Sequence, residues 1–146
     1  MQAADLEAYL HEQIPLSSAM RVRVVSVEQN GVVLAAPLEP NTNHRGTVFG
    51  GSASALAILA AWAILHARCR DEGIAARLVI RRNTMEYERP MVGEFTARAR
   101  LESNEQWQTF AHTLARKRKA RITIVATVEH RGEAAARFTG EFVAIG

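Results

Sequence analysis

The chain has 146 residues and a hydrophobic fraction of 48%, enough for one domain with a sizeable core. Its formal net charge is +3 at pH 7, and the single cysteine, Cys69, excludes an intrachain disulfide. The charge is uneven, because residues 1–73 hold 5 Lys or Arg against 7 Asp or Glu, whereas residues 74–146 hold 13 against 8. We expect a single domain over residues 1–146 whose basic second half could attract nucleic acid, anionic lipid or a phosphate-bearing cofactor.

The first elements that the sequence predicts are a short helix and a hairpin. Residues 3–13 have the spacing of an amphipathic helix, which Pro15 ends. From Ala19 to Glu28 apolar and polar residues alternate, which indicates a strand. Asn30-Gly31 is a strong signal for a tight turn, and the returning strand is predicted from Val32 to Leu38.

The most informative stretch begins at Thr42, where a polar loop leads into a helix that is apolar on nearly every face. The longest strictly apolar run, residues 55–65, has 11 residues, whereas a membrane-spanning helix needs about 20. We therefore expect a buried core helix from Gly51 to Glu72, roughly 33 Å long, and no membrane partner.

The N-terminal residues favour a cytoplasmic protein. Asp5, Glu7 and Glu12 fall where a signal peptide would be apolar. Together with the unpaired Cys69, these charges predict a reducing, intracellular setting.

Four strands and one helix are predicted after the central helix. The strands lie at residues 78–89, 95–102, 122–128 and 136–144, and the helix at 103–116. Ser103 and Gln106 match a capping box, and Trp107 is expected to anchor this helix by packing. The hairpin that precedes the central helix cannot cover it alone, so one antiparallel sheet must curl around it.

This order of elements resembles the hotdog fold, an α+β fold in which a curved antiparallel sheet wraps one long helix. Hotdog thioesterases commonly carry G-x-x-H-G-G at the start of that helix, and here Phe49 replaces the histidine in residues 46–51. The chain is most similar to the thioesterase family typified by the C-terminal domain of the YiiD protein. The matching segments are NHRGTVFGGS (43–52), the helix around Trp62, YERPMVGEF (87–95) and EQWQTFAHTLARKRKARI (105–122).

The resemblance implies a homodimer, with a tetramer as a further assembly, that hydrolyses acyl thioesters at a site shared by two subunits. The implied substrates are acyl-CoA or an acyl-carrier protein, and no cofactor is expected beyond the coenzyme A moiety of the substrate. Two other functions stay open. One is a non-catalytic module that binds acyl chains or acyl carriers, and the other is a hotdog hydratase or dehydratase.

The start of the central helix supplies the first predicted catalytic groups. The first N–H groups of a helix have no intrahelical partner, and Gly50 and Gly51 would let a thioester carbonyl approach them without a side chain in the way. We expect Ser52 to cap the helix or to position water.

The group that activates water is harder to assign. Relatives with the histidine motif commonly carry Asp or Glu about two turns into the helix, but no carboxylate occurs from Thr42 to Arg70. His44 is the first candidate to take a proton from water, with Asn43 orienting the water or the carbonyl. Glu86 and Glu88 on the following strand rank below His44.

The remaining predicted site residues hold the substrate; they are Phe49, Ser54, Arg82, Arg89, Arg116, Arg118 and Lys119. The run from Arg116 to Arg121 is either a solvated turn or a site for the phosphates of coenzyme A or of a carrier arm. We expect no nucleic-acid partner, because no binding motif is present and aromatic residues make up only 6%. No metal is expected either, since the five histidines lack the spacing of zinc ligands.

Overall fold

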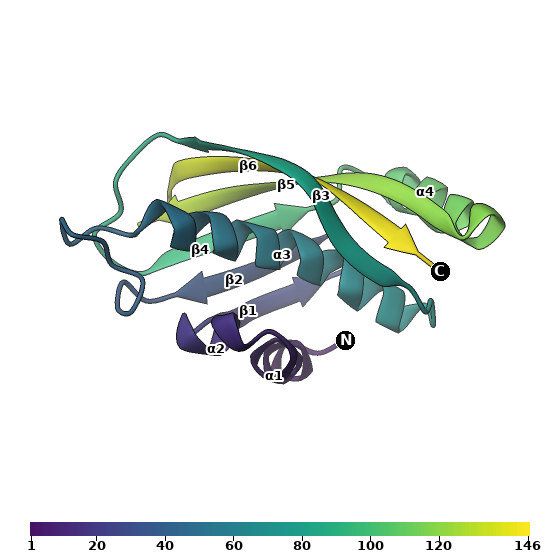
Figure 1. The fold of residues 1–146 in the computed structure, drawn as a ribbon, viewed down its shortest axis with the longest axis horizontal. Coiled ribbons are helices and arrows are strands. Elements are labelled where there is room, and N and C mark those ends of the chain that lie inside the picture. The colour runs from purple at the N-terminus through teal and green to yellow at the C-terminus, as the bar shows by residue number, and fades with distance from the viewer.

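The computed structural model describes residues 1–146 and contains one curved, six-stranded antiparallel sheet that wraps a long helix (Figure 1). This architecture confirms the predicted hotdog fold. The helices are α1 (Ala3–Gln13), α2 (Pro15–Ala19), α3 (Gly50–Asp71) and α4 (Asn104–Lys117). The strands are β1 (Arg23–Glu28), β2 (Gly31–Ala36), β3 (Arg77–Tyr87), β4 (Phe95–Arg100), β5 (Lys119–His130) and β6 (Glu133–Ile145).

Helix α3 is the centre of the core and contacts β2, β3, β4, β5 and β6. Its alanines explain how one helix packs against so many strands. Ala57, Ala60 and Ala61 are fully buried, and their small side chains let the sheet approach the helix axis closely. By length and composition α3 would suffice to cross a membrane, but 61% of its apolar 18-residue window is buried inside the domain. It is therefore the core helix that the sequence predicted.

The strands lie in the order β1-β2-β4-β5-β6-β3. β1 and β2 form the predicted hairpin, with Glu28 opposite Gly31. The chain then passes through α3 and returns as β3 at the far edge, where it pairs with β6 from Arg77–Ile145 to Tyr87–Ala136. As a result, the end of β3 lies close to the start of α3 (Figure 1).

The two edges of the sheet are protected differently. Helix α1 covers the β1 edge, where the Val24 N–H donates to Glu7 Oε1 at 2.8 Å and His11 Nε2 hydrogen bonds to the Val22 carbonyl oxygen at 2.7 Å. On its side away from β6, β3 pairs with no strand, and Val79 on this strand is 52% exposed. The β3 edge is therefore the one at which another strand could pair.

The structure corrects the sequence prediction between residues 14 and 22. The predicted strand from Ala19 is too long at its start, because Pro15 occupies the first turn of the short helix α2 and β1 begins only at Arg23. Met20 and Val22 are buried in the turn between the two elements. Their alternation with charged residues therefore reflects burial of a turn, not of a strand.

The other boundaries differ by a few residues. β2 ends at Ala36 rather than Leu38, directly before Pro37, because proline lacks the N–H that a strand ladder needs. The last strand begins at Glu133, earlier than the predicted 136. β3 ends at Tyr87 instead of Arg89, so its last two predicted residues belong to the loop that borders the candidate site.

Candidate active site

The loop before α3 is held together by Asn43. Its Oδ1 accepts from the N–H groups of Arg45 (2.8 Å) and Thr47 (3.1 Å), and its Nδ2 donates to Thr47 Oγ1 at 2.8 Å. Both ends of the side-chain amide are thus used inside the loop. His44 is exposed beside it, with its ring free of any hydrogen bond to the chain.

The first turn of α3 leaves two backbone donors unpartnered. The Phe49 carbonyl oxygen accepts from the N–H groups of Ser52 (2.9 Å) and Ala53 (3.1 Å). The N–H groups of Gly50 and Gly51 donate to no backbone or side-chain acceptor in the chain. These two donors lie at the positive end of the helix dipole, where a developing negative charge is stabilised.

The expectation that Ser52 caps the helix is wrong. Phe49 occupies the cap position, and no side chain caps the helix start. Ser52 lies within the first turn and is half-buried there. The helix start is therefore open to an external acceptor rather than closed by a hydroxyl.

Two aromatic rings flank the glycines. A Cβ at Gly51 would lie 2.3 Å from Phe49 Cε2, so only glycine fits beneath this ring as it stands. A Cβ at Gly50 would lie 3.4 Å from Tyr87 Cε1, and the Tyr87 hydroxyl donates to the Gly50 carbonyl oxygen at 3.3 Å. Sequence reasoning missed Tyr87 because the contact joins residues 37 positions apart.

A cavity of about 350 Å³ lies beside this helix start. Its walls come from the first turn of α3, the end of β3 with the loop after it, and the start of β6. Gly50, Tyr87, Glu88 and Arg89 all line it, and Glu88 is the only acidic residue among those that do. The volume is within the usual range for small-molecule sites.

The two charged residues that line this cavity form ion pairs with residues outside its wall. Both oxygens of Glu88 accept from Nε of Arg137 at 3.2 Å, and Arg89 forms an ion pair with Glu133. Glu88 and Arg137 are 40% and 58% exposed. Solvent weakens such a pair, so the carboxylate is not locked to the guanidinium.

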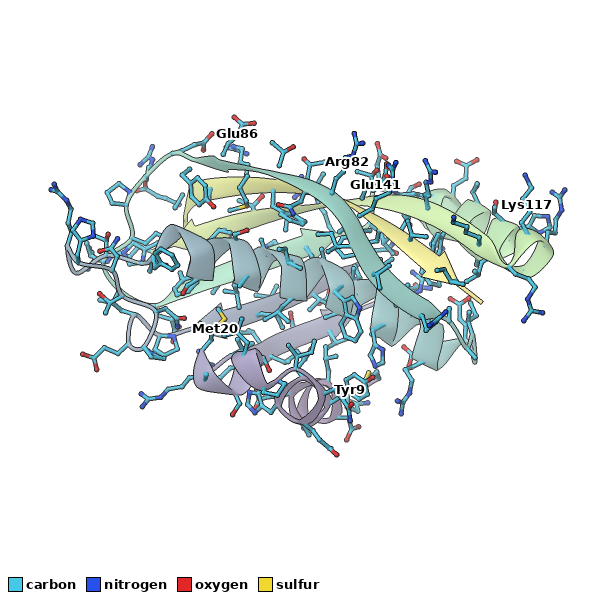
Figure 2. All side chains as sticks on the ribbon, viewed as in Figure 1. Tyr9, Met20, Arg82, Glu86, Lys117 and Glu141 are labelled. Atoms are coloured by element: carbon cyan, nitrogen blue, oxygen red, sulfur yellow. The ribbon has the colours of Figure 1, made fainter.

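The predicted basic residues are spread along the molecule. Arg89 lines the cavity, whereas Arg82 is exposed midway along β3 (Figure 2). Arg116, Arg118 and Lys119 lie where α4 joins β5, at the end of the molecule away from the start of α3 (Figure 1). Within a single chain, these three basic residues are therefore far from the start of α3.

Two further predicted residues are near the helix start but outside the cavity wall. Phe49 is 56% exposed, with its ring over Gly51. Ser54 is half-buried in the second turn of α3. His44 and Asn43 also do not line this cavity.

A second, entirely apolar groove of about 430 Å³ runs between α3 and β3. Ala55, Ile58, Leu59 and Trp62 form one wall, and residues 78–80 of β3 form another. Exposed apolar surface of this extent marks an interaction site or a place for an apolar ligand.

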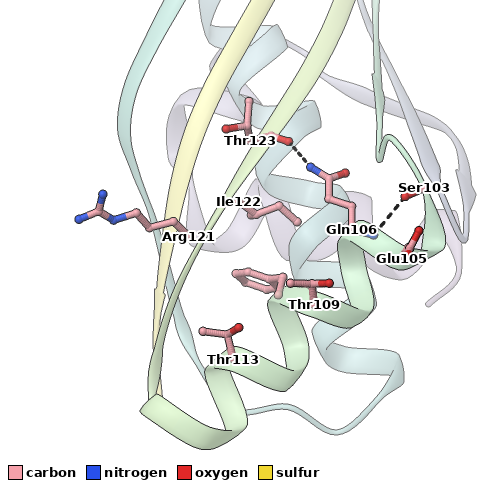
Figure 3. Close-up of a pocket in the computed structure, with 9 residues that line it drawn as sticks. Ser103, Glu105, Gln106, Thr109, Thr113, Arg121, Ile122 and Thr123 are labelled. Carbon is pink, nitrogen blue, oxygen red and sulfur yellow. Dashed lines mark hydrogen bonds between the residues drawn. The ribbon is translucent and has the colours of Figure 1, made fainter.

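A third cavity, of about 480 Å³, is polar and lies between α4 and β5 (Figure 3). Hydroxyl-bearing side chains and Arg121 line it, and Gln106 Nε2 spans it by donating to the Thr123 carbonyl oxygen at 2.8 Å. Helix α4, which forms one of its walls, lies at the end of the molecule away from the start of α3 (Figure 1). This cavity therefore adds no group to the chemistry at the helix start.

The titratable side chains deep in α3 do not belong to the site. Burial, and then the charge of Arg70, lower the pKa of His66, whose ring stacks with those of Tyr9 at 4.3 Å and Trp62 at 4.7 Å. Burial, and then Glu72, raise the pKa of Cys69 to about 11. His66 is roughly 24 Å along the helix from Gly50. No three side chains of His, Cys, Asp or Glu gather in a group that could hold a metal ion.

Comparison with known proteins gives a family match over residues 3–146, to the family described as "Putative thioesterase (yiiD_Cterm)". A solved protein of unknown function from Chlorobaculum tepidum TLS is 27% identical with a TM-score of 0.93, over 98% of this chain and 93% of that one. The putative thioesterase from Shewanella oneidensis is 23% identical with a TM-score of 0.88, over 99% of this chain and 97% of that one. At this identity the second likeness supports the fold alone.

Proposed function

This chain belongs to the thioesterase family typified by the yiiD C-terminal domain, and on that premise we propose that it hydrolyses acyl thioesters of coenzyme A or of an acyl-carrier protein. The observation that carries the proposal is the pair of unpartnered N–H groups of Gly50 and Gly51 at the start of α3, where Gly50 lines a cavity. A thioester carbonyl oxygen that accepts from these donors becomes more polarised. As water adds to the carbonyl carbon, the oxygen gains negative charge, and the donors stabilise it.

Expulsion of the thiolate then completes the reaction. The C–S bond breaks, the acyl group leaves as a carboxylic acid, and the sulfur takes a proton. Because the donors are backbone groups at a fixed helix end, they need no reorganisation when the charge develops. Removing one such donor typically lowers the rate by about 100- to 1,000-fold.

Within this proposal, Asn43 and His44 support the reaction without belonging to the cavity wall. The Asn43 amide holds the loop that leads to the glycines, so we assign it to positioning the helix start. His44 is exposed with its ring unpartnered, and we assign it to water or substrate at the mouth of the site. Ser52, Ser54 and Phe49 lie at the same helix start, outside the cavity wall.

We further propose that the active form is a homodimer joined through β3. The β1 edge is covered by α1, but β3 pairs with a strand on one side only. A two-fold axis beside β3 would pair this edge with the same edge of a second copy. The apolar groove between α3 and β3 would then be covered by the partner and hold the acyl chain away from water.

A dimer of this kind also gives the basic residues a role. Arg77, Ile145 and Lys119 lie in register across β3, β6 and β5. When two β3 strands pair antiparallel, the Arg77 end of one copy lies beside the Tyr87 end of the other. Arg116, Arg118 and Lys119 of one copy would then face the neighbouring site and bind substrate phosphates, with Arg82 and Arg89 closer to the reaction centre.

A second candidate function is a non-catalytic module that binds acyl chains or acyl carriers. The absence of any carboxylate from Thr42 to Arg70 favours it. The two functions are separated by measuring thiol release and binding on the same samples, with acyl-CoA thioesters of graded chain length. Hydrolysis supports the enzyme, whereas saturable binding without thiol release supports the module and rejects the enzyme.

A further inference from the structure

The open edge strand β3 carries two charged side chains that form no ion pair within the chain. Arg82 and Glu86 are exposed and project from the side of β3 away from α3 (Figure 2). The β6 residues beside them in register are Glu141 and Arg137. Both of these already have partners, because Glu141 accepts from Arg81 Nη1 at 2.6 Å and Arg137 donates to the carboxylate that follows β3. One chain therefore leaves a positive and a negative charge unpaired on the same strand.

The backbone of β3 is open to a further strand mainly over its second half. In the first half, Trp62 Nε1 donates to the Leu78 carbonyl oxygen at 3.1 Å, so this acceptor is already in use. A bulge then interrupts the register between Ile80 and Arg82. From Arg82 to Tyr87 the register with β6 is unbroken. This segment is therefore the part of the edge to which a second copy can add.

The alternation of an antiparallel ladder limits how two such edges can meet. Because the Glu88 N–H donates to the Ala135 carbonyl oxygen of β6, alternation turns the backbone groups of Asn83 and Met85 toward the open edge. A two-fold axis perpendicular to the sheet keeps every side chain on its own face. Residues that lie opposite each other must share a face, so the axis passes through a residue and not between two residues.

We infer that Arg82 and Glu86 set the register of the proposed dimer by pairing across a two-fold axis at Thr84. The inference rests on the homodimer proposed above, and it names the residues that select this pairing. Symmetry makes the Arg82–Glu86 pair twice, in non-hydrogen-bonded positions where opposite side chains are closest. An axis at Asn83 would set Arg82 opposite Thr84. An axis at Met85 would set Glu86 opposite Thr84, so only the axis at Thr84 pairs both free charges.

This register brings the cavity of one copy to the apolar groove of the other. Tyr87, which lines the cavity together with Gly50, falls opposite Arg81 of the second copy. The residue before Arg81 is Ile80, which lines the groove between α3 and β3. A thioester whose carbonyl lies at the glycine donors of one copy would therefore have the groove of the other copy beside it for its acyl chain.

The test exchanges charges between two variants of the full chain. In a homodimer of Arg82→Glu two carboxylates meet at each pair, and in a homodimer of Glu86→Arg two guanidinium groups meet. We expect the dimer dissociation constant of each variant, measured by analytical ultracentrifugation, to rise about 10-fold or more over wild type. A mixture of the two variants places opposite charges at both pairs, so it should form mixed dimers with an affinity close to that of wild type.

Arg100→Glu is the matched control for the charge change. Arg100 is exposed and forms no ion pair, but it lies on β4, away from the open edge. The same change of charge there should leave the dissociation constant unchanged. Dimers of Arg82→Glu and of Glu86→Arg that are as tight as wild type would overturn the inference.

Thr84→Cys tests the register directly. An axis at this residue brings the two introduced thiols together, so oxidation should link the two copies by a disulfide, while the native Cys69 is buried. Thr139→Cys is the control, because Thr139 is exposed and lies beside Thr84 on β6. Its counterpart would be three strand spacings away, about 14 Å, which is too far for a disulfide.

The outcomes separate the inference from the proposed function. A dimeric Thr84→Cys protein that forms no intersubunit disulfide overturns the register and leaves the proposed hydrolysis standing. A monomeric wild-type chain overturns the proposed dimer and the inference with it. Thiol release from acyl-CoA by the wild-type chain decides the hydrolysis separately, since neither the dissociation constant nor the disulfide depends on turnover.

Discussion

At the scale of single residues, the Gly50 N–H can be removed with little other change. Gly50 is the first residue of α3, where proline is tolerated, and Phe49 before it is extended (φ −61, ψ 132), as a residue before proline prefers. We expect Gly50→Pro to lower kcat/KM for acyl-CoA hydrolysis by about 100- to 1,000-fold.

Gly50→Ala is the comparison that isolates this donor. Alanine adds the same Cβ, 3.4 Å from the Tyr87 ring, but keeps the N–H. Its loss of rate should therefore be far smaller than that of Gly50→Pro in the same thiol-release assay. Equal losses in the two variants would mean that the ring contact matters and the N–H does not. Thermal melts of both proteins check that each is folded.

Cys69 allows a pH prediction. Because burial raises its pKa from 9.0 to about 11, the thiol stays protonated at pH 8 in the folded chain. We expect a disulfide reagent to modify Cys69 about 100-fold more slowly in the native protein than in urea, from ionisation alone. The folded state holds this proton between pH 9 and 11 while the unfolded state releases it, so the thiol contributes stability below pH 9 that is lost as the pH rises toward 11. Rapid native labelling at pH 8 would contradict this.

The candidate site shows how far local sequence reasoning extends. The open helix start followed from Gly50 and Gly51 themselves, because adjacent glycines at a helix start indicate close backbone approach by a ligand. The other residues that line the cavity could not be predicted from the local sequence. Tyr87 and Glu88 reach it only because β3 runs along the far edge of the sheet and ends beside the start of α3, and spacing along one chain carries no such information.

At the scale of elements, one buried arginine joins three of them. Arg68 of α3 is 5% exposed, and its Nη1 donates to the Gln29 carbonyl oxygen and to Asn30 Oδ1 in the β1–β2 turn. Its guanidinium also lies 4.7 Å from the Trp107 ring of α4. Glu72 completes the cluster, accepting from Arg68 and from the Trp107 indole.

We therefore expect Arg68→Ala to lower the free energy of unfolding by about 2–4 kcal/mol, measured by urea denaturation. The loss would combine the hydrogen bonds to the turn with the packing against Trp107. Arg70→Ala is the control, because Arg70 lies two residues further along the same helix but is exposed. Its effect should stay within about 0.5 kcal/mol. Equal effects from the two substitutions would show that net charge, not the cluster, matters.

The elements themselves were largely predictable. The alanine-rich apolar run indicated a buried helix, and period-two alternation marked the strands, because both patterns are set by which side chains avoid water. The same criterion misassigned residues 19–22, where a buried turn mimics alternation. α2 escaped prediction because a helix of 5 residues leaves almost no periodic signal.

At the scale of the whole molecule, the uncovered strand edge predicts the oligomeric state. We expect the protein to be a dimer of its 16.1 kDa chain by light scattering, and Val79→Lys to shift it toward monomer, because a charge on an edge strand opposes pairing. Val25→Lys on β1 is the control, with similar exposure of 50% against 52%. It should leave the mass unchanged. A Val79→Lys protein that remains a dimer would place the interface elsewhere.

The proposed dimer also predicts which chain supplies the glycines and which chain supplies the basic residues of each site. Neighbouring strands in a sheet are about 4.8 Å apart. In a β3–β3 pairing, Lys119 of one copy is therefore three strand spacings, roughly 14 Å, from the other copy's β3. Each site would then combine the glycines of one chain with the basic residues of its partner. The long arm of coenzyme A must span the distance between these two groups of residues.

Two inactive variants should therefore rescue each other when mixed. Gly50→Pro removes the donor but keeps the basic residues, whereas Arg116→Gln with Lys119→Gln keeps the donor but weakens phosphate binding. After unfolding and refolding together in equal amounts, half of the dimers would be mixed, and each would contain one intact and one doubly impaired site. Thiol release should then recover to about a quarter of the wild-type kcat/KM. If the basic residues act within their own chain, mixing pairs no intact halves, and the activity would equal the mean of the two parent variants.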